Sequence, residues 1–219
     1  MTDPLAVLQR VREGRARAAP RPGEQCELCS EPIADEHGHL VDLKVRRLLC
    51  ACRGCWLLFT PDGAGGGHFR AVPDRWLAFP DVRLTPAEWD ALQIPVGVAF
   101  FFVNSELGRV AAFYPGPAGA TESLLPLGTW DEVVAAHTDL STLEPDVEAL
   151  LVRAGGRGGA GGGAGAGRDG AEVWLVPIDA CYELVGELRR LWRGFDGGRE
   201  AHDALEVFFA RVRERSGTR

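Results

Sequence analysis

The most chemically informative residues of this chain are cysteines near the N-terminus. Cys26 and Cys29 form one C-x2-C pair, and Cys52 and Cys55 form a second pair after an insert of 22 residues. A C-x2-C turn can aim two sulfurs at one tetrahedral ion, so two such turns supply the four thiolates of a metal centre. We therefore predict that these four cysteines bind a metal ion, and that the centre is structural because four protein ligands leave no open position.

Three further residues near these pairs leave alternatives open. Cys50 lies two residues before Cys52, so on a strand both side chains would face the same way. Cys50 could replace Cys52 as a ligand, or it could be a thiol beside the centre. His37 and His39 are possible metal ligands too, but four cysteines already fill a tetrahedron, and we expect these histidines to be ordinary loop residues.

The rest of the chain offers little that indicates catalysis. Cys181 lies near the start of an expected helix and could be a reactive thiol, but the flanking sequence is that of a packing helix, so we expect a buried apolar side chain. We find no Ser/His/Asp or Cys/His combination and no pair of carboxylates placed for acid–base work. The sequence therefore predicts no catalytic residues and no organic cofactor, and it favours a non-enzymatic function.

The elements that must position the cysteines are short. Two β-prone runs, residues 39–45 and 47–51, predict a hairpin between the two C-x2-C pairs. The apolar segment 56–59 follows Cys55. It could start a helix, which would give a treble-clef arrangement, or form a strand, which would give a zinc ribbon. Both alternatives remain open from the sequence.

The remainder of the chain predicts an α+β fold in which helices cover an antiparallel sheet. Residues 96–104 and 109–114 read as a hairpin, and residues 172–178 read as a strand of the same sheet. Pro177 suggests an edge position for that third strand, because proline cannot donate to the ladder. Thr85 and Glu88 form a capping box that starts a helix. The helices are expected at about residues 85–92, 130–137, 145–152, 180–192 and 200–213.

These features predict three parts in the chain. Residues 1–21 read as a flexible N-terminal arm, residues 22–70 as the four-cysteine metal-binding unit, and residues 71–219 as the α+β domain. Residues 155–170 contain ten glycines in sixteen positions. Such a composition cannot bury enough apolar area to offset its ordering entropy, so we expect a disordered insertion there.

Composition and charge exclude several classes of function. The net charge of −7 argues against general affinity for nucleic acid. No apolar stretch approaches the roughly 18 residues that a membrane span needs. In the N-terminal segment an acidic residue precedes the apolar patch and arginines follow it, the reverse of a signal peptide, so we expect a cytoplasmic protein. In a reducing cytosol, clustered thiols favour metal over disulfides.

Several strings along the chain resemble the DUF5947 family, uncharacterised actinobacterial proteins that are often encoded beside nickel–iron hydrogenase genes. The resemblance extends from about Cys26 to Phe209 and is interrupted by the Gly-rich stretch. It implies an accessory factor for hydrogenase assembly or function, with a hydrogenase subunit or maturation factor as protein partner, and it supplies no catalytic residues. The strings are CELC, LVDL, RRLLCACRGCWLLF, VPDRW, IPVGVAFFFVNS, YPGPAGATESLL, LEPDVEALL, WLVPIDACYELVG and RGFDGG.

The cysteine pairs also resemble those of rubredoxins, which hold one iron by two C-x2-C turns. Rubredoxin turns usually have glycine after the second cysteine, whereas Ser30 and Trp56 stand at these positions here. This departure favours zinc over iron. The leading hypothesis is a zinc-binding accessory or adaptor protein. The alternative is a rubredoxin-like iron protein, or a thiol redox protein using Cys50 and Cys181, that serves a hydrogenase.

Overall fold

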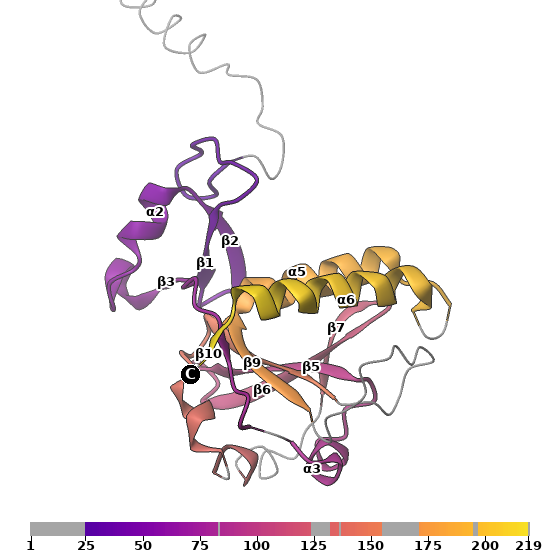
Figure 1. Ribbon diagram of the computed structural model, residues 1–219. Coiled ribbons are helices and arrows are strands. Elements are labelled where there is room, and N and C mark those ends of the chain that lie inside the picture. Colours follow the sequence, from indigo (N-terminus) through magenta and orange to yellow (C-terminus); the bar gives the residue numbers. More distant parts are fainter. Residues whose placement is uncertain are drawn as a thin grey trace, which may run out of the picture. The chain divides into compact units, whose positions relative to one another are not determined.

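The computed structural model describes most of the chain, and the predicted N-terminal arm and Gly-rich insertion lie outside the described residues. It divides into two compact units: a first with the described residues up to Asp42 and Arg47–Ala71, and a second with Leu43–Arg46 and the described residues from Val72 onward (Figure 1). Both contain mostly antiparallel strands with helices, so the predicted α+β class is confirmed. The described residues are 25–82, 84–123, 132–135, 137–154, 171–194 and 197–218.

The first unit is built on a three-stranded sheet. Strand β1 (Gly38–Asp42) pairs with β2 (Arg47–Ala51) as an antiparallel hairpin, which confirms the predicted hairpin between the cysteine pairs. Strand β3 (Phe69–Ala71) pairs with the other edge of β1, giving the order β2-β1-β3. A 3-10 turn, η1 (Ala64–Gly67), precedes β3.

Helix α2 (Arg53–Leu58) begins directly after β2, so the segment after the second cysteine pair is helical and not a strand. A cysteine turn, a hairpin and a helix that carries the second cysteine pair follow one another, which is the treble-clef alternative. The core of this unit is small because few large apolar side chains are available to it. Its buried members are Cys26, Leu40, Leu49, Ala51 and Cys55, and Ile33, Trp56, Phe59 and Phe69 pack against them.

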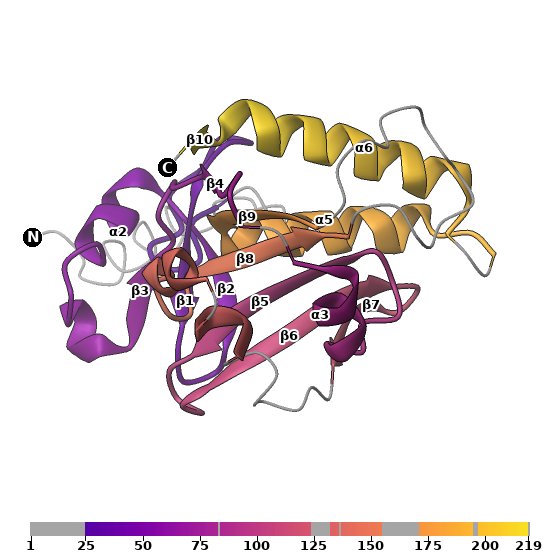
Figure 2. The same cartoon turned by 60° about the horizontal axis from the view of Figure 1, so that its bottom comes forward.

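The second unit is a seven-stranded sheet with the order β10-β4-β9-β8-β5-β6-β7 (Figure 2). All neighbours are antiparallel except β10 and β4, which are parallel. The strands are β4 (Leu77–Ala78), β5 (Val98–Asn104), β6 (Arg109–Gly116), β7 (Gly119–Ser123), β8 (Glu148–Arg153), β9 (Glu172–Pro177) and β10 (Gly217–Thr218).

Two of the strand predictions are confirmed and one detail is wrong. Strands β5 and β6 form the predicted hairpin, and β9 lies in the same sheet, joined to that hairpin through β8. The edge position expected for β9 is wrong, because β9 lies between β4 and β8. Pro177 is tolerated there because it is the last residue of the strand and β4 pairs only with Trp174 and Leu175.

The helix predicted at residues 145–152 is also wrong, since this segment contains strand β8. All residues of β8 (Glu148–Arg153) except Arg153 are buried. Leu150 and Val152 belong to the core on one face of the sheet, and Ala149 and Leu151 alternate onto the other face. A strand buried on both faces reads as a continuous apolar run, and periodicity cannot tell such a run from a buried helix.

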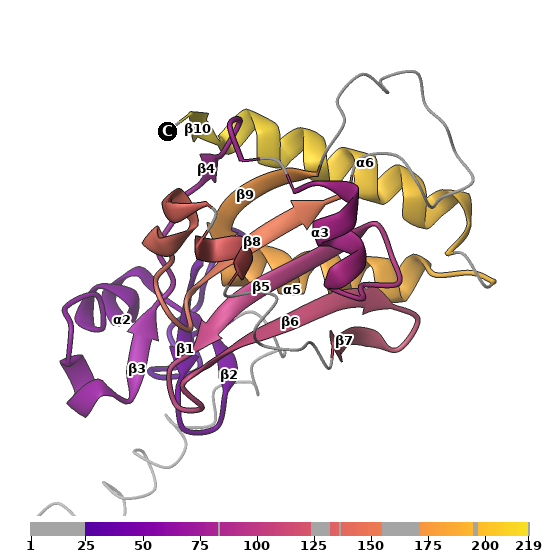
Figure 3. The ribbon, with the colours of Figure 1, turned by 90° about the horizontal axis from the view of Figure 1, so that it is seen from below.

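Helices cover both faces of this sheet. Helices α5 (Ile178–Leu191) and α6 (Gly198–Arg215) lie on one face, where Trp174 of β9 contacts Phe209 with ring centroids 5.3 Å apart. The short helix α3 (Pro86–Ala91) lies on the other face (Figure 3). A 3-10 turn, η2 (Thr138–Thr142), precedes β8.

The other helix predictions agree with the structure. Helix α3 starts with the predicted capping box, and the last two helices match α5 and α6 within about two residues. Of the helix expected at residues 130–137, the structure describes a helical segment at 132–135. None of the helices within the described residues is long and apolar enough to cross a membrane.

Candidate metal centre

The first cysteine pair lies on a tight loop that the backbone closes on itself. The Ser30 amide donates to the Cys26 carbonyl (2.8 Å), and the Cys26 amide donates to the Glu31 carbonyl (2.8 Å). Ser30 takes a left-handed conformation with φ of 62°, which turns the chain back after Cys29. The loop buries Cys26 and leaves Cys29 exposed.

The second pair lies where β2 passes into α2. Strand β2 ends at Ala51, and Cys52 is the N-cap of the helix. Its Sγ accepts a hydrogen bond from the Cys55 amide at 3.4 Å, and its carbonyl accepts one from the Trp56 amide at 2.9 Å. The helical turn therefore holds both sulfurs of this pair on the same side of the chain.

Glu27 joins the two pairs. Its backbone amide donates to the Cys50 carbonyl (2.9 Å), and its carboxylate Oε2 accepts from the Cys50 amide (2.7 Å). Its other carboxylate oxygen lies 3.6 Å from the Arg47 guanidinium. One residue between Cys26 and Leu28 thus clamps the first loop to β2, immediately before the second cysteine pair.

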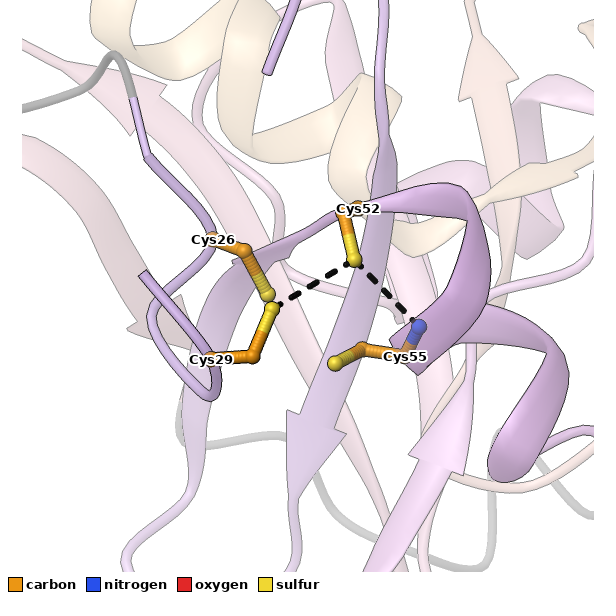
Figure 4. Close-up of side chains that lie close together, drawn as sticks. All are labelled: Cys26, Cys29, Cys52 and Cys55. Carbon is orange, nitrogen blue, oxygen red and sulfur yellow. Dashed lines mark hydrogen bonds between the residues drawn. The ribbon is translucent and has the colours of Figure 1, made fainter. Parts of the chain in front are cut away.

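The structure brings together all four cysteines that the spacing singled out (Figure 4). Their sulfurs lie within 4.8 Å of one another, and Cys29 Sγ lies 3.6 Å from Cys52 Sγ. In a tetrahedron with metal–sulfur bonds of about 2.3 Å, the sulfurs stand about 3.8 Å apart. The four side chains are therefore arranged so that they could hold a metal ion with little rearrangement.

The electrostatics of the cluster favour a bound cation. Burial raises the pKa of the Cys26 thiol, but hydrogen bonds from the backbone at Cys52, Cys29 and Leu28 outweigh burial and lower the pKa to about 6. Burial and the neighbouring sulfurs raise the pKa of Cys55 well above its ordinary value. One thiolate thus forms readily, and its negative charge opposes further ionisation nearby. A cation among the sulfurs would remove that opposition.

Cys50 lies in a different group. It stands on β2 directly opposite His39 of β1, and its thiol gathers with the imidazoles of His37 and His39. The strand alternation that would have turned Cys50 and Cys52 the same way stops at Ala51, where β2 ends. We expected His37 and His39 to be ordinary loop residues, but His39 lies on β1 and both imidazoles lie close to the Cys50 thiol. The signal for this grouping was their i, i+2 spacing beside a cysteine on the predicted partner strand.

Cys181 lies on α5 with none of its surface exposed, as the packing-helix interpretation expected. Burial raises the pKa of this thiol well above its ordinary value, and the nearby Asp179 raises it further. An inaccessible thiol that resists ionisation is a poor nucleophile. The alternative in which Cys181 serves as an exposed redox thiol is therefore wrong.

Comparison with known proteins places the chain in a family but gives it no activity. No curated protein and no solved structure is significantly similar to it. A family model described as a family of unknown function, DUF5947, matches residues 25–216. This match takes in both the four-cysteine cluster and the sheet with its helices. The chain belongs to the DUF5947 family.

Proposed function

We propose that this chain is a non-enzymatic zinc-binding adaptor protein of the cytoplasm, with Cys26, Cys29, Cys52 and Cys55 as the zinc ligands. The observation that carries the proposal is the convergence of four sulfurs within 4.8 Å of one another. Four thiolates complete the tetrahedron that zinc prefers and leave no position for substrate, so the ion acts in folding and not in chemistry.

The first unit has a physical need for such an ion. Its core contains few large apolar side chains, and two of its five buried members are cysteines of the cluster. A unit this small rarely gains enough from apolar burial alone, and bound zinc contributes its binding free energy to folding. When bound, zinc would hold the first loop, β2 and α2 together.

The surface of the first unit supports an adaptor role. Leu57 and Leu58 on α2 are 50% and 67% exposed, and Leu28 in the first cysteine loop is 37% exposed. Large apolar side chains next to a structural metal centre are suited to gripping a protein partner. The hydrogenase context of the family suggests a nickel–iron hydrogenase subunit or maturation factor as that partner. The charge of −7 argues against nucleic acid.

One observation favours the iron alternative. Ser30 keeps the left-handed conformation that glycine adopts at least cost, so the residue change from the usual glycine of rubredoxin turns does not argue against iron at this position. The second pair differs, because its chain continues into α2. A rubredoxin-like iron protein that passes electrons near a hydrogenase is therefore the second candidate, and iron would show as thiolate-to-iron absorption in the purified protein.

Gene deletion in a hydrogenase-bearing host tests the proposed function. Loss of hydrogenase maturation, restored by the wild-type gene, supports the adaptor. Intact hydrogenase with altered oxygen sensitivity supports the redox alternative, and an unchanged hydrogenase contradicts both. Complementation with Leu58→Ser should fail if α2 grips the partner. The matched control is Val207→Ser, which removes a side chain that is 71% exposed on α6 and should complement fully.

A further inference from the structure

A second group of metal-ligating side chains lies in the first unit, apart from the four cysteines. His37 immediately precedes β1, His39 lies on β1, and Cys50 stands opposite His39 on β2. Residues i and i+2 point to the same side of an extended chain, so the two imidazoles and the thiol face one another. One ligand atom from each lies within 4.8 Å of the others.

The His37 ring is oriented as a metal ligand would be. Its Nδ1 lies 2.9 Å from the Ala34 carbonyl oxygen. A carbonyl only accepts, so Nδ1 must carry the proton, which leaves the lone pair of a neutral ring on Nε2. Metal-binding histidines commonly use this arrangement, in which a backbone carbonyl fixes the tautomer and frees the other nitrogen for the ion.

The Nε2 atom of His37 lacks a partner where it lies. It is shielded from solvent and, within the described part of the chain, accepts no hydrogen bond. The ring of His39 lies beside it, with centroids 4.8 Å apart and planes tilted by 53°. A shielded ring nitrogen with a free lone pair costs free energy unless a hydrogen-bond donor or a metal ion occupies that position.

We propose that His37, His39 and Cys50 form a second metal site, which binds a divalent transition-metal ion of the zinc type through two imidazole nitrogens and one thiolate. Ions of this borderline softness accept both kinds of donor. Three protein ligands leave a fourth position for water or another small ligand, so this site differs from the four-sulfur centre. It holds its ion less tightly and exchanges it more readily.

The site is independent of the proposed zinc centre in its ligands but close to it in sequence. Cys50 is two residues before Cys52, and Glu27 holds the Cys50 amide at 2.7 Å. Glu27 holds the backbone amide of Cys50 and not its thiol, so the side-chain change Cys50→Ala should leave this hydrogen bond and the four sulfurs in place. This separation lets one experiment distinguish loss of the second site from loss of the first.

The test uses the full chain carrying one tightly bound zinc ion, after a weak chelator has removed looser metal. Cobalt(II) is then titrated under reducing, oxygen-free conditions and followed by its absorption, with zinc content measured in parallel. We expect one further equivalent of cobalt to bind with thiolate-to-cobalt absorption while the tight zinc stays. His37→Gln and Cys50→Ala should weaken this second event by at least the roughly 10–100-fold that loss of an outer-shell partner costs.

His202→Gln is the matched control, because His202 Nδ1 also lies close to a backbone carbonyl, that of Gly198 at 2.7 Å, but in the second unit. It should bind the second equivalent like the wild type. Equal cobalt binding by His37→Gln and His202→Gln would overturn the proposal, as would cobalt binding that releases the tight zinc.

A second measurement does not depend on any variant. In nitrogen-15 spectra of the wild-type protein, zinc added beyond the first equivalent should shift the Nε2 signal of His37 and leave that of His202 unchanged. Histidine signals that ignore the added zinc would contradict the second site even if the variants failed to fold.

Discussion

The two units stabilise buried acidic groups in opposite ways. In the second unit, the Glu148 carboxylate is completely buried and the chain supplies its cation, Arg75. In the first unit, the main influences on the pKa values of the two buried cluster thiols, Cys26 and Cys55, among the residues described, are burial, hydrogen bonds and other cysteines. A guanidinium or ammonium is not among them. From this comparison we predict that the second unit folds without a ligand and that the first unit needs a bound cation.

The Glu148 site is complete without any ligand. Arg75 Nε donates to Glu148 Oε1 at 2.6 Å, and its Nη2 donates to Oε2 and to the Thr142 carbonyl. The Glu144 amide adds a further bond to Oε2 at 2.8 Å. Both carboxylate oxygens are therefore satisfied within the second unit, as a buried charge requires.

The largest effect is expected from a variant that removes a cysteine ligand from the first unit. Cys55→Ser should abolish tight metal binding and unfold the first unit, because structural zinc contributes about 10–16 kcal/mol of apparent binding free energy. The second unit, with its own large core, should remain folded. Metal analysis and amide spectra check both outcomes, with Cys181→Ala as the thiol control. A Cys55→Ser protein with full metal content and native first-unit signals would refute the ligand assignment.

The next largest effect is expected from a variant that removes the cation beside Glu148 in the second unit. Arg75→Met should cost about 3–5 kcal/mol, because it leaves the buried Glu148 carboxylate without its cation. Glu148→Gln should cost less, since the Arg75 side chain is 37% exposed and water can solvate its charge. Urea unfolding of the second unit measures both. Costs below about 1 kcal/mol would show that the pair contributes little. Equal costs would show that solvation of the exposed Arg75 side chain does not offset the loss of its partner.

A smaller effect is expected from the packing of Gly38 against Trp56 in the first unit. A Cβ on Gly38 would lie 2.6 Å from Trp56 Cδ1, so Gly38→Ala must displace the residue that follows Cys55. Overpacking of this kind costs about 1–3 kcal/mol. Gly54→Ala is the control. A Cβ on Gly54 would lie 3.9 Å from Cys52 Sγ, an ordinary van der Waals contact, and alanine favours a helix over glycine by about 0.5–1 kcal/mol.

Thermal unfolding of the metal-loaded first unit compares these two glycine variants. Gly38→Ala should lower the midpoint, and Gly54→Ala should keep or raise it. If both variants unfold at the same temperature, the contact between Gly38 and Trp56 does not limit the packing of this unit.

The smallest effect concerns the capping box of α3. Thr85→Ala should cost about 1 kcal/mol, because the Glu88 amide loses the hydroxyl that accepts from it. Hydrogen bonds from the Thr85 amide and hydroxyl lower the pKa of Glu88, so its stabilisation is present above the unfolded pKa of about 4.3 and is lost as pH falls through the folded value. Unfolding measured from pH 6 to pH 3 should show a weaker pH dependence in Thr85→Ala.

Local signals made much of this fold predictable. The hairpin of β5 and β6 and the capping box of Thr85 and Glu88 depend on neighbours in sequence, and both are present. The spacing of the C-x2-C pairs likewise predicted which sulfurs come together. Short-range rules suffice where the stabilising contacts are themselves short-range.

Features that depend on distant partners could not be predicted in this way. Strand β8 reads as a helix because burial on both faces removes its alternation. The partnership of Arg75 with Glu148 spans 73 positions, and no local pattern marks it. The i, i+2 spacing of His37 and His39 is visible in the sequence, but their grouping with Cys50 also depends on the register of β1 on β2, which pairs His39 with Cys50.

The most direct test of the central claim is the metal content of the full chain, purified under reducing conditions without added metals and passed over a weak chelator. We expect one zinc ion per chain, a colourless protein, and unfolding of the first unit when a strong chelator removes the ion. A red protein with one iron per chain would contradict the zinc assignment. A metal-free protein whose first unit is fully folded would contradict the metal centre itself.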